Sequence, residues 1–484
     1  MDVIKFSHME FLTYTGIHLI LRSKGKEHVM SSFDIVLNGG RVMDPESNTD
    51  RVANVGISDG TIQAISGEVL EGKESINAAG LVVAPGAIDM HSHGQDDENY
   101  RIQALDGVTS CLELELGVLD IDEWYGDREG KALTNFGASV GHIPVRMKVM
   151  NDPADMLPIA DGAYKEASED QINEMKELMH KGLRSGALAM GFGLAYTPNA
   201  SRWEALEMFR VASHYGAPCH VHMRGVGNKE PLNSIEGLSE LVAASATSGA
   251  PLHLVHINSS GLRAVPSLLQ MIEEARSNGV DVTTECYPYE ASMTGIESAL
   301  FGEGWQDRYG IDYGDLQWAE TGERLTASTF AEYRETGGMV IVHSMRQEIV
   351  DGAVSSPLTA IASDGFLRDG KGHPRTAGCY TKVLGHYVRE SRVISLMDAI
   401  RKLALMPAQR LESVAPAFKK KGRVSVGADA DLILFDPDRV IDRSTYKDPT
   451  LSPEGMLHVL VNGVSVVSDG VIQEGVLPGK GIRS

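Results

Sequence analysis

Strand-like and helix-like segments alternate through the middle of this 484-residue chain, and this alternation limits its fold more than any other feature. Eight segments resemble strands, each followed by a candidate helix or a long loop: APGAIDMH, GVTSCLELE, FGASVGH, GALAMGFG, PCHVHM, LHLVHI, VDVTTECYPY and LTAIASD. Repeated strand–helix units form parallel sheets, and polar residues gathered at the strand ends favour a closed barrel over a doubly wound sheet. The sequence predicts an α/β fold with a (β/α)8, TIM-like barrel over residues 85–414.

The segment SEDQINEMKELMHKGLRSG shows why the intervening pieces are expected to be helices. Ser168 is suited to cap a helix, and Gln171 stands where a capping box requires it. Gly182 or Gly186 then ends the helix. One apolar face at helical spacing is formed by Ile172, Met175, Leu178 and Met179.

Both ends of the chain contain strand-like segments in which apolar and polar residues alternate. FDIVLNGGRVMDPES and VANVGISDGTIQAIS predict hairpins that turn at residues 38–40 and 59–60. GRVSVGADADLILFD and MLHVLVNGVSVVSDGVIQ follow the same pattern, with turns at 462–463 and 469–470. Two separate patches would leave exposed edges. We therefore expect residues 33–84 and 415–484 to form one small β-sandwich domain.

Residues from about 293 to 338 depart from the strand–helix alternation and contain four large aromatic side chains, Trp305, Tyr309, Tyr313 and Trp318. The barrel scaffold does not require such a segment. We expect an insertion over the barrel mouth, a candidate lid.

Charge and cysteine content narrow the cellular setting. Lys and Arg number 44 against 66 Asp and Glu, a net charge of −22 that disfavours nucleic acids and anionic membranes as partners. The four cysteines have no CxxC spacing, which indicates reduced thiols and a cytoplasmic location. Residues 1–32 lack a signal-peptide cleavage site and are expected to be a poorly ordered leader. Whether the chain forms a homo-oligomer is left open.

The sharpest local signal is His91-Ser92-His93, which closes the first barrel strand. Residues i and i+2 of a strand point to the same face, so both imidazoles can reach one ion. Its position at a strand end, after PGAID, strengthens this interpretation because barrel strands converge at their C-terminal face.

Further histidines end later strands. His220 and His222 share a face in CHVHMRG, and His222 is preferred because it lies nearer the strand end, with His220 as the alternate. His256 ends LHLVHI, whereas His253 has the opposite parity and is assigned to structure. We expect His222 and His256 to face the same ion site as the HxH pair.

Carboxylates complete the candidate set. Glu113 and Glu115 lie on one face of an apolar strand, where a buried carboxylate is costly unless it is paired or metal-bound. Glu115, nearer the end, is the preferred ligand and Glu113 the alternate. Asp364 ends the last strand and is the candidate acid/base, or an additional ligand. The chain has neither a GxSxG elbow nor a Gly-rich phosphate loop.

From Phe33 to about Val467 the sequence resembles the D-aminoacylases (N-acyl-D-amino-acid deacylases) of the amidohydrolase superfamily. The motifs that carry the resemblance are PGAIDMHSHG, SVGHIPVRMKVM, GLAYTP, HVHMR, VHINSSG, YPYEAS, IASDG, GHPRTAGCYTKVLGHYVRE and GADADLILFDPDRVIDRSTY. The resemblance implies cleavage of a small-molecule amide by one or two zinc ions, with manganese or another divalent metal as an alternative.

The resemblance also implies site residues. His91 and His93 would hold one metal position, His222 and His256 the other, and Asp364 would act as acid/base. The substrate-binding candidates are Tyr196, Tyr287, Ser292, Asn258, Arg224, His142 and Arg375.

Two departures from the family pattern concern this site. The usual strand-two cysteine is replaced by ELELG, and a glutamate ligand favours a bridged two-metal site with harder ions. The lysine that normally follows the strand-six histidine is Asn258 here, which puts N-acyl-D-amino-acid specificity in question. Arg224 would supply either the missing charge or a structural salt bridge.

Two other functions remain as alternatives. A cyclic-amide hydrolase of the dihydroorotase or hydantoinase type shares the fold, but it normally uses a carboxylated lysine, and the chain has no convincing lysine at a strand end. A catalytically inactive barrel that acts as a scaffold would be expected to lose ligands, whereas the full set is present here.

Overall fold

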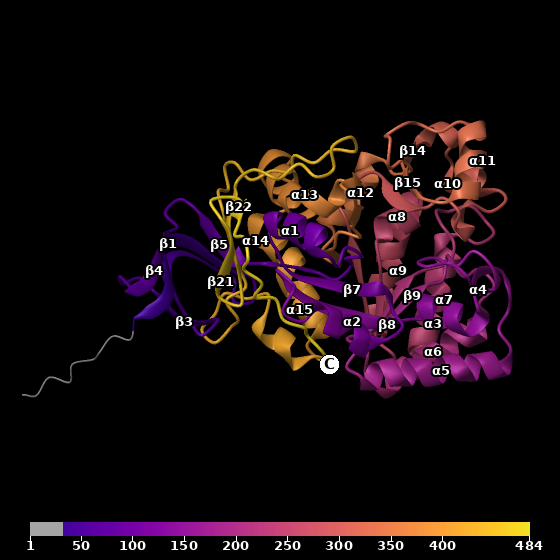
Figure 1. The fold of residues 1–484 in the computed structure, drawn as a ribbon, viewed down its shortest axis with the longest axis horizontal. Helices are drawn as coiled ribbons and strands as arrows, with labels where there is room; N and C mark the ends of the chain where they lie inside the picture. The colour runs from indigo at the N-terminus through magenta and orange to yellow at the C-terminus, as the bar shows by residue number, and fades with distance from the viewer. Residues whose placement is uncertain (1–31) are drawn as a thin grey trace, which may run out of the picture. The chain divides into compact units, whose positions relative to one another are not determined.

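The computed structural model describes residues 32–484, of which Phe33–Ser484 form one compact unit (Figure 1). The leader expected at residues 1–32 lies outside the described residues except for Ser32. Within residues 32–484, no helix combines the length and apolar character needed to cross a bilayer.

Within the described residues, an eight-stranded parallel sheet forms the predicted barrel, in the order β16-β12-β11-β10-β9-β8-β7-β6. Each of the eight strands predicted from the sequence is present. Their bounds are β6 Ala87–Asp89, β7 Val108–Val118, β8 Asn135–Gly141, β9 Met190–Gly193, β10 Cys219–His222, β11 Leu252–Leu254, β12 Val282–Cys286 and β16 Thr359–Ile361.

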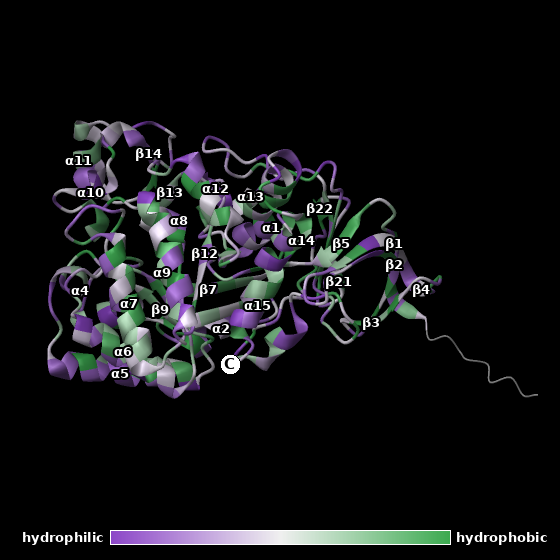
Figure 2. Cartoon of the chain, turned by 180° about the vertical axis from the view of Figure 1, so that it is seen from behind, coloured by the Kyte–Doolittle hydropathy of each residue, from purple (hydrophilic) through white to green (hydrophobic). Residues whose placement is uncertain are grey.

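Helices surround the barrel. The longer ones are α1 Asp97–Leu105, α2 Ile121–Arg128, α3 His142–Met150, α5 Glu169–Arg184, α6 Arg202–His214, α7 Ser234–Ser248, α9 Val265–Ser277, α12 Gln347–Ser355 and α13 Arg375–Lys382. The predicted capping box of α5 is present, with Ser168 and Gln171 each bonding the other's backbone N–H. The last residue of the helix is Arg184. Of the two glycines predicted to stop it, Gly186 (φ +91°) lies just after the helix, whereas Gly182 lies within it. Purple and green residues both occur along α5 in Figure 2, as expected for an amphipathic helix.

The barrel closes between its last and first strands through the loops that follow them. The backbone N–H of Asp364 donates to the carbonyl of His91 at 2.7 Å, and Ser92 forms a bridge with Gly365. The side chain of Asp89 accepts the backbone N–H of Ser363 at 3.0 Å. The closure therefore brings the SDG segment directly beside the HxH pair.

Strands from the two chain ends pair, as the sequence predicts. Among residues 32–484 they form one nine-stranded sheet, in which β5 pairs antiparallel with β19. The bounds are β1 Phe33–Asp44, β2 Thr49–Ser58, β3 Thr61–Ser66, β4 Gly72–Asn77, β5 Val82–Pro85, β19 Leu432–Phe435, β20 Met456–Val461, β21 Val464–Ser468 and β22 Val471–Ile472. The division at residues 84/85 and 414/415 stays a prediction.

The sheet carries a hydrophobic core of its own. Leu432 and Leu434 of β19 join Leu37 and Val55 in this core, whereas Ile433 of β19 joins the barrel core. Alternate residues of one strand thus serve two hydrophobic cores, which attaches the sheet to the barrel.

Three of the four predicted turns are present, at 59–60, 462–463 and 469–470, each with both residues at positive φ as in a type I′ hairpin. The turn predicted at 38–40 is wrong. β1 runs on to Asp44, and the register shifts between Leu37 and Gly40, with Gly39 at φ +71°. A left-handed glycine can make a β-bulge as well as a turn, and the strand continues through it.

The segment expected as a lid is a folded insertion between β12 and β16. It contains a three-stranded sheet of β13 Ser292–Gly295, β15 Met339–Val342 and β14 Leu316–Trp318, with helices α10 Trp305–Tyr309 and α11 Ala327–Thr336. Its side chains form a separate core that includes Phe301, Trp305 and Trp318. In Figure 1, α10, α11, β14 and β15 lie together at the upper right, above α8 (Ile257–Gly261). Movement of this insertion as a lid stays a prediction.

Candidate metal centre

The HxH imidazoles are each held on one side by a buried carboxylate. Glu285 of β12 contacts Nδ1 of His91 at 2.6 Å, and Glu113 contacts Nδ1 of His93 at 2.7 Å. The two Nε2 atoms face each other at 3.2 Å. When each Nδ1 keeps its proton and donates it in a hydrogen bond to the carboxylate, both Nε2 atoms direct lone pairs into the same space. A bound cation would stabilise this arrangement.

The charges around His91 and His93 also favour a bound cation. Burial opposes protonation of His91 and His93, yet the nearby carboxylates of Asp364, Glu285 and Glu113 raise the pKa of His91 to about 9 and that of His93 well above its usual value. The cluster carries more negative than positive charge, which a divalent metal ion would balance.

Glu115 lies between the two pairs of histidines. Its Oε2 is 3.6 Å from Nε2 of His93 and 3.8 Å from Nε2 of His91, and its Oε1 is 3.3 Å from Nδ1 of His222. Glu113 instead accepts the backbone N–H groups of Leu116 and Gly117 and holds His93. The geometry therefore favours Glu115 over Glu113 as the candidate ligand.

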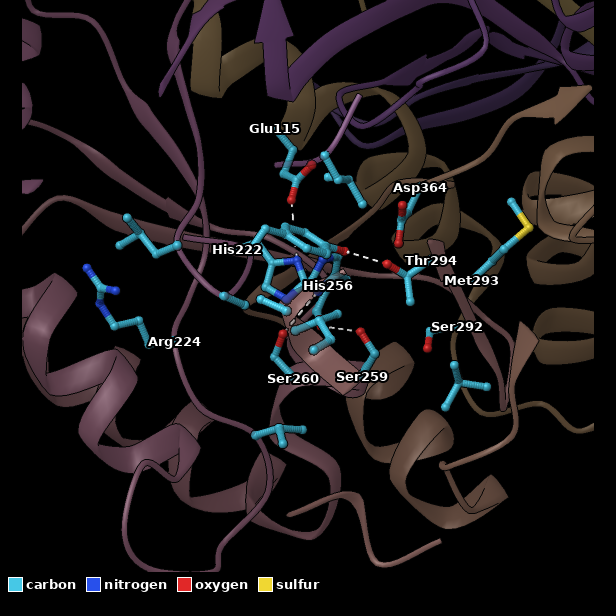
Figure 3. Close-up of a pocket in the computed structure, with 18 of the residues that line it drawn as sticks. Glu115, His222, Arg224, His256, Ser259, Ser260, Ser292, Met293, Thr294 and Asp364 are labelled. Atoms are coloured by element: carbon cyan, nitrogen blue, oxygen red, sulfur yellow. Dashed lines mark hydrogen bonds and ion pairs between the residues drawn. The ribbon is translucent and has the colours of Figure 1, made fainter. Parts of the chain in front are cut away.

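The rings of His222, the last residue of β10, and His256, two residues after β11, meet edge to face with centroids 4.5 Å apart (Figure 3). His256 has a φ of +30°, a left-handed conformation that costs free energy and that often marks a functional site. His220 is fully buried, with its ring tilted by 30° against that of His253 at a centroid distance of 4.5 Å, and it lies outside the candidate metal groups. Among the described residues, the candidate metal groups include His222, which the sequence favoured, and not His220, and the role of His222 as a ligand stays a prediction.

Asp364 follows β16, also at positive φ (+52°). Its Oδ1 is 3.4 Å from Nε2 of both His91 and His93, and its Oδ2 is 2.9 Å from the guanidinium of Arg375. Burial alone would raise the pKa of Asp364, but Arg375 and His91 outweigh it and hold that pKa well below its usual value. Asp364 is therefore a carboxylate, with Oδ1 turned to the cluster.

Three overlapping sets of side chains could each hold a metal ion within residues 32–484: His91, His93 and Glu115; His91, His256 and Asp364; Glu115, His222 and His256. Their ligand atoms lie within 4.8 Å of one another in each set. The barrel thus brings all the candidate ligands together.

A cavity of about 350 Å³ opens beside this cluster, and it separates the predicted substrate residues into two groups. Tyr196 and Ser292 line it, and the Tyr196 hydroxyl is 3.1 Å from that of Thr294. Tyr287 and Asn258 are buried behind the wall, where the Asn258 amide donates to the Tyr287 carbonyl at 3.0 Å. Arg375, behind Asp364, places its guanidinium 4.6 Å from the Tyr287 ring centre.

Two substrate candidates have other roles in the structure. His142 is fully buried, 2.7 Å from Glu204 and stacked on Phe192, outside the cavity lining. Arg224 lines the cavity, but its guanidinium pairs with Glu240 at 3.1 Å and donates to three backbone carbonyls. Figure 3 shows it apart from the histidines. Core packing accounts for His142, and the structural salt bridge, one of the two roles expected for Arg224, accounts for its guanidinium. A contact of either side chain with the substrate stays a prediction.

Sequence reasoning missed Glu285, which supports two imidazoles. One oxygen contacts His91, and the other contacts Nε2 of His253 at 3.0 Å. The carboxylate is 1% exposed within the largely buried strand β12. The cost of burying a carboxylate, which identified Glu113 and Glu115, would have identified Glu285 as well.

Replacing Glu285 with Gln is expected to weaken metal binding by roughly 10- to 100-fold, since His91 loses the charge that orients its ring and raises its basicity. Competition with a chelator of known affinity measures this change. Glu274→Gln, on the exposed side of α9, is the matched control. Equal affinities for the two variants would contradict the orienting role.

A model of the amidohydrolase family matches residues 139–467, more than half of the chain. The chain belongs to the amidohydrolase family. It is a hydrolase of carbon–nitrogen bonds other than peptide bonds, as the sequence predicts.

Relatives of this amidohydrolase support the predicted resemblance to D-aminoacylases. The N-acyl-D-glutamate deacylase of Alcaligenes xylosoxydans xylosoxydans is 29% identical, over 90% of this chain and 94% of that protein. The D-aminoacylase of the same organism is 27% identical, with the same coverage of both chains. The structure is similar, with a TM-score of 0.79 and 25% identity, to the N-acyl-D-glutamate deacylase of Bordetella bronchiseptica complexed with zinc and a phosphonate inhibitor, over 94% of this chain and all of that chain.

Proposed function

We propose that this amidohydrolase is a metal-dependent deacylase that cleaves the linear amide bond of an N-acyl amino acid, in the manner of the N-acyl-D-amino-acid deacylases. The observation that carries the proposal is the convergence of His91, His93, Glu115, His222 and His256 beside a cavity large enough for a small substrate. The relatives named above act on N-acyl-D-amino acids.

The donor set suits one or two zinc ions, with manganese or another divalent metal as an alternative. Imidazole and carboxylate are common zinc ligands, and Glu115 lies where it could serve both histidine pairs. When bound, such an ion supplies Lewis-acid activation of water and of the amide carbonyl.

Asp364 would move the proton. Arg375 holds its Oδ2, so Oδ1 is the oxygen that faces the cluster and the cavity. Oδ1 would accept the proton of the attacking water and then donate it to the departing nitrogen. Tyr196 and Ser292, in the cavity wall, would orient the substrate through their hydroxyl groups.

The two alternatives are weaker. A cyclic-amide hydrolase would normally place a lysine at the metal site, and the three candidate metal sets within residues 32–484 contain none. A scaffold has no need for strained backbone at His256 and Asp364 beside a complete donor set. We further propose a cytoplasmic location, because the four cysteines are buried as free thiols.

A substrate screen tests the proposal. Metal-loaded enzyme would be assayed with N-acetyl and N-formyl derivatives of D- and L-amino acids and with hydantoins. We expect the enzyme to hydrolyse the linear N-acyl compounds, and to hydrolyse the D-amino acid derivatives faster than the L-amino acid derivatives. Turnover of hydantoins alone would favour the cyclic-amide alternative, and purified protein without stoichiometric metal would favour the scaffold.

A further inference from the structure

Much of the wall of the cavity beside the metal cluster is apolar. Leu116 and Leu157 come from the barrel side, and Met293 and Phe301 come from the insertion. A wall of this kind binds the methyl and methylene groups of a substrate. A charged side chain in such a wall needs a partner that offsets its charge.

Arg308 of α10 lines this cavity, and its side chain is half-buried. Its Nη1 donates to the carbonyl of Glu303 at 2.6 Å, and its Nη2 lies 3.3 Å from the carbonyl oxygens of Leu300 and Gly302. Within residues 32–484, its Nε–H and the second N–H of Nη1 have no partner, and no carboxylate pairs with the guanidinium. These two N–H groups remain available to an anion.

The other two arginines of the cavity wall share one carboxylate. Arg224 pairs with one oxygen of Glu240 at 3.1 Å, and Arg202 approaches the other oxygen at 3.5 Å. Arg202 keeps free N–H groups as well, but its side chain is 62% exposed and lies toward solvent. Among the arginines that line the cavity in the described part of the chain, Arg308 alone has no carboxylate partner, so its charge is the one that a substrate would offset.

Arg308 lies away from the metal cluster. The ring of Tyr196 is 4.9 Å from that of His222, and burial together with the carboxylates of the cluster raises the pKa of Tyr196. Tyr309, which follows Arg308 and also lines the cavity, has its pKa raised to about 12 by burial, and the charge of Arg308 opposes this rise. The cavity therefore has carboxylates at the end near Tyr196 and an unpaired cation at the end near Tyr309.

We propose that Arg308 binds a substrate carboxylate that lies several bonds from the scissile amide, as the side-chain carboxylate of an N-acyl-D-glutamate does. The methylene groups between the amide and this carboxylate would pack on the apolar wall, and the free N–H groups of Arg308 would donate to the carboxylate oxygens. This inference rests on the deacylase function proposed above and narrows its substrate class to amino acids with an acidic side chain. Arg308 is then a specificity-determining residue that the insertion supplies.

Three substrates of the same shape test the inference with the full-length, metal-loaded enzyme. They are N-acetyl-D-glutamate, N-acetyl-D-glutamine, whose side chain is neutral, and N-acetyl-D-isoglutamine, whose α-carboxyl group is masked as an amide. Release of acetate reports cleavage of the N-acetyl bond alone. We expect kcat/KM for the glutamate derivative to exceed that for the glutamine derivative by about 10- to 100-fold, because only the glutamate side chain pairs with Arg308.

Variants of Arg308 test charge as the cause. Arg308→Gln is expected to remove most of this preference, and Arg308→Lys to keep part of it. Arg334→Gln is the matched control, because Arg334 of α11 donates to the carbonyls of Ile296 and Ser298 in the same insertion but lies outside the cavity lining. We expect the control to keep the preference. A merely structural role of Arg308 would lower kcat/KM for the glutamate and glutamine derivatives together.

The outcomes separate the inference from the proposed function. Equal kcat/KM for the glutamate and glutamine derivatives, or a preference that survives in Arg308→Gln, would overturn the inference and leave the deacylase function standing. If Arg308→Gln instead lost a preference for glutamate over isoglutamine, Arg308 would bind the α-carboxylate, and the remote position would be wrong. If metal-loaded enzyme cleaved none of these compounds and no other N-acyl amino acid, the deacylase function would itself be overturned.

Discussion

Asp364→Asn is expected to reduce kcat by roughly 10²- to 10⁴-fold while metal content stays near normal. The asparagine side chain keeps an oxygen for the guanidinium of Arg375, 2.9 Å away, so the buried arginine retains a partner. It cannot accept the proton of the attacking water at Oδ1, the atom that faces His91 and His93. Steady-state kinetics on an active N-acyl substrate, with elemental analysis of the same preparation, measures both quantities.

The matched control is Asp369→Asn. Asp369 is an exposed aspartate nearby, also at positive φ (+51°), and asparagine tolerates that conformation. We expect this variant to retain full activity. An Asp364→Asn enzyme with near-normal kcat would remove Asp364 from the proton-transfer role and require another acid/base in the cavity.

Glu115→Gln and Glu113→Gln are expected to differ sharply, although the two residues share one face of β7. Glu115 lies 3.3–3.8 Å from three imidazoles, so its loss removes a candidate ligand and should weaken metal binding by more than ~100-fold. Glu113 only orients His93 and bonds the β7 backbone, so its loss should cost about 10-fold to 100-fold.

Two measurements distinguish the two variants: metal affinity, from competition with a chelator, and kcat at saturating metal. Excess metal should restore Glu113→Gln because its ligand set is intact, whereas Glu115→Gln should stay impaired. The reverse order would make Glu113 the ligand and would reassign the centre of the site.

The barrel could be predicted because its evidence is local and repeated. Each of the eight strands has its own apolar pattern, and the capping box at Ser168 and Gln171 needs only neighbouring residues. The bulge at Gly39 could not be separated from a turn, because the same left-handed glycine suits both and only strand pairing decides.

A site residue could be chosen from the sequence where its position along a strand, and the face on which it lies, decide between candidates. It could not be chosen where its role depends on a hydrogen-bonding partner far away in the sequence. His222 could be preferred to His220 from its place in β10. The partners of Arg224 and His142 lie on other elements, and no local pattern shows that Glu240 and Glu204 occupy their polar atoms. Glu285 could have been singled out as a buried carboxylate, but its pairing with His91, 194 positions away, is visible only in the closed barrel.

Imidazoles and carboxylates from separate barrel strands are proposed to bind a catalytic metal ion. Anomalous X-ray diffraction at the zinc edge, from crystals of the zinc-loaded protein, tests this proposal. We expect a peak about 2.0–2.2 Å from ring nitrogens of His91 and His93 or of His222 and His256, with a Glu115 oxygen in its coordination sphere. A zinc peak elsewhere, or none at this cluster in protein that cleaves amides, would contradict it.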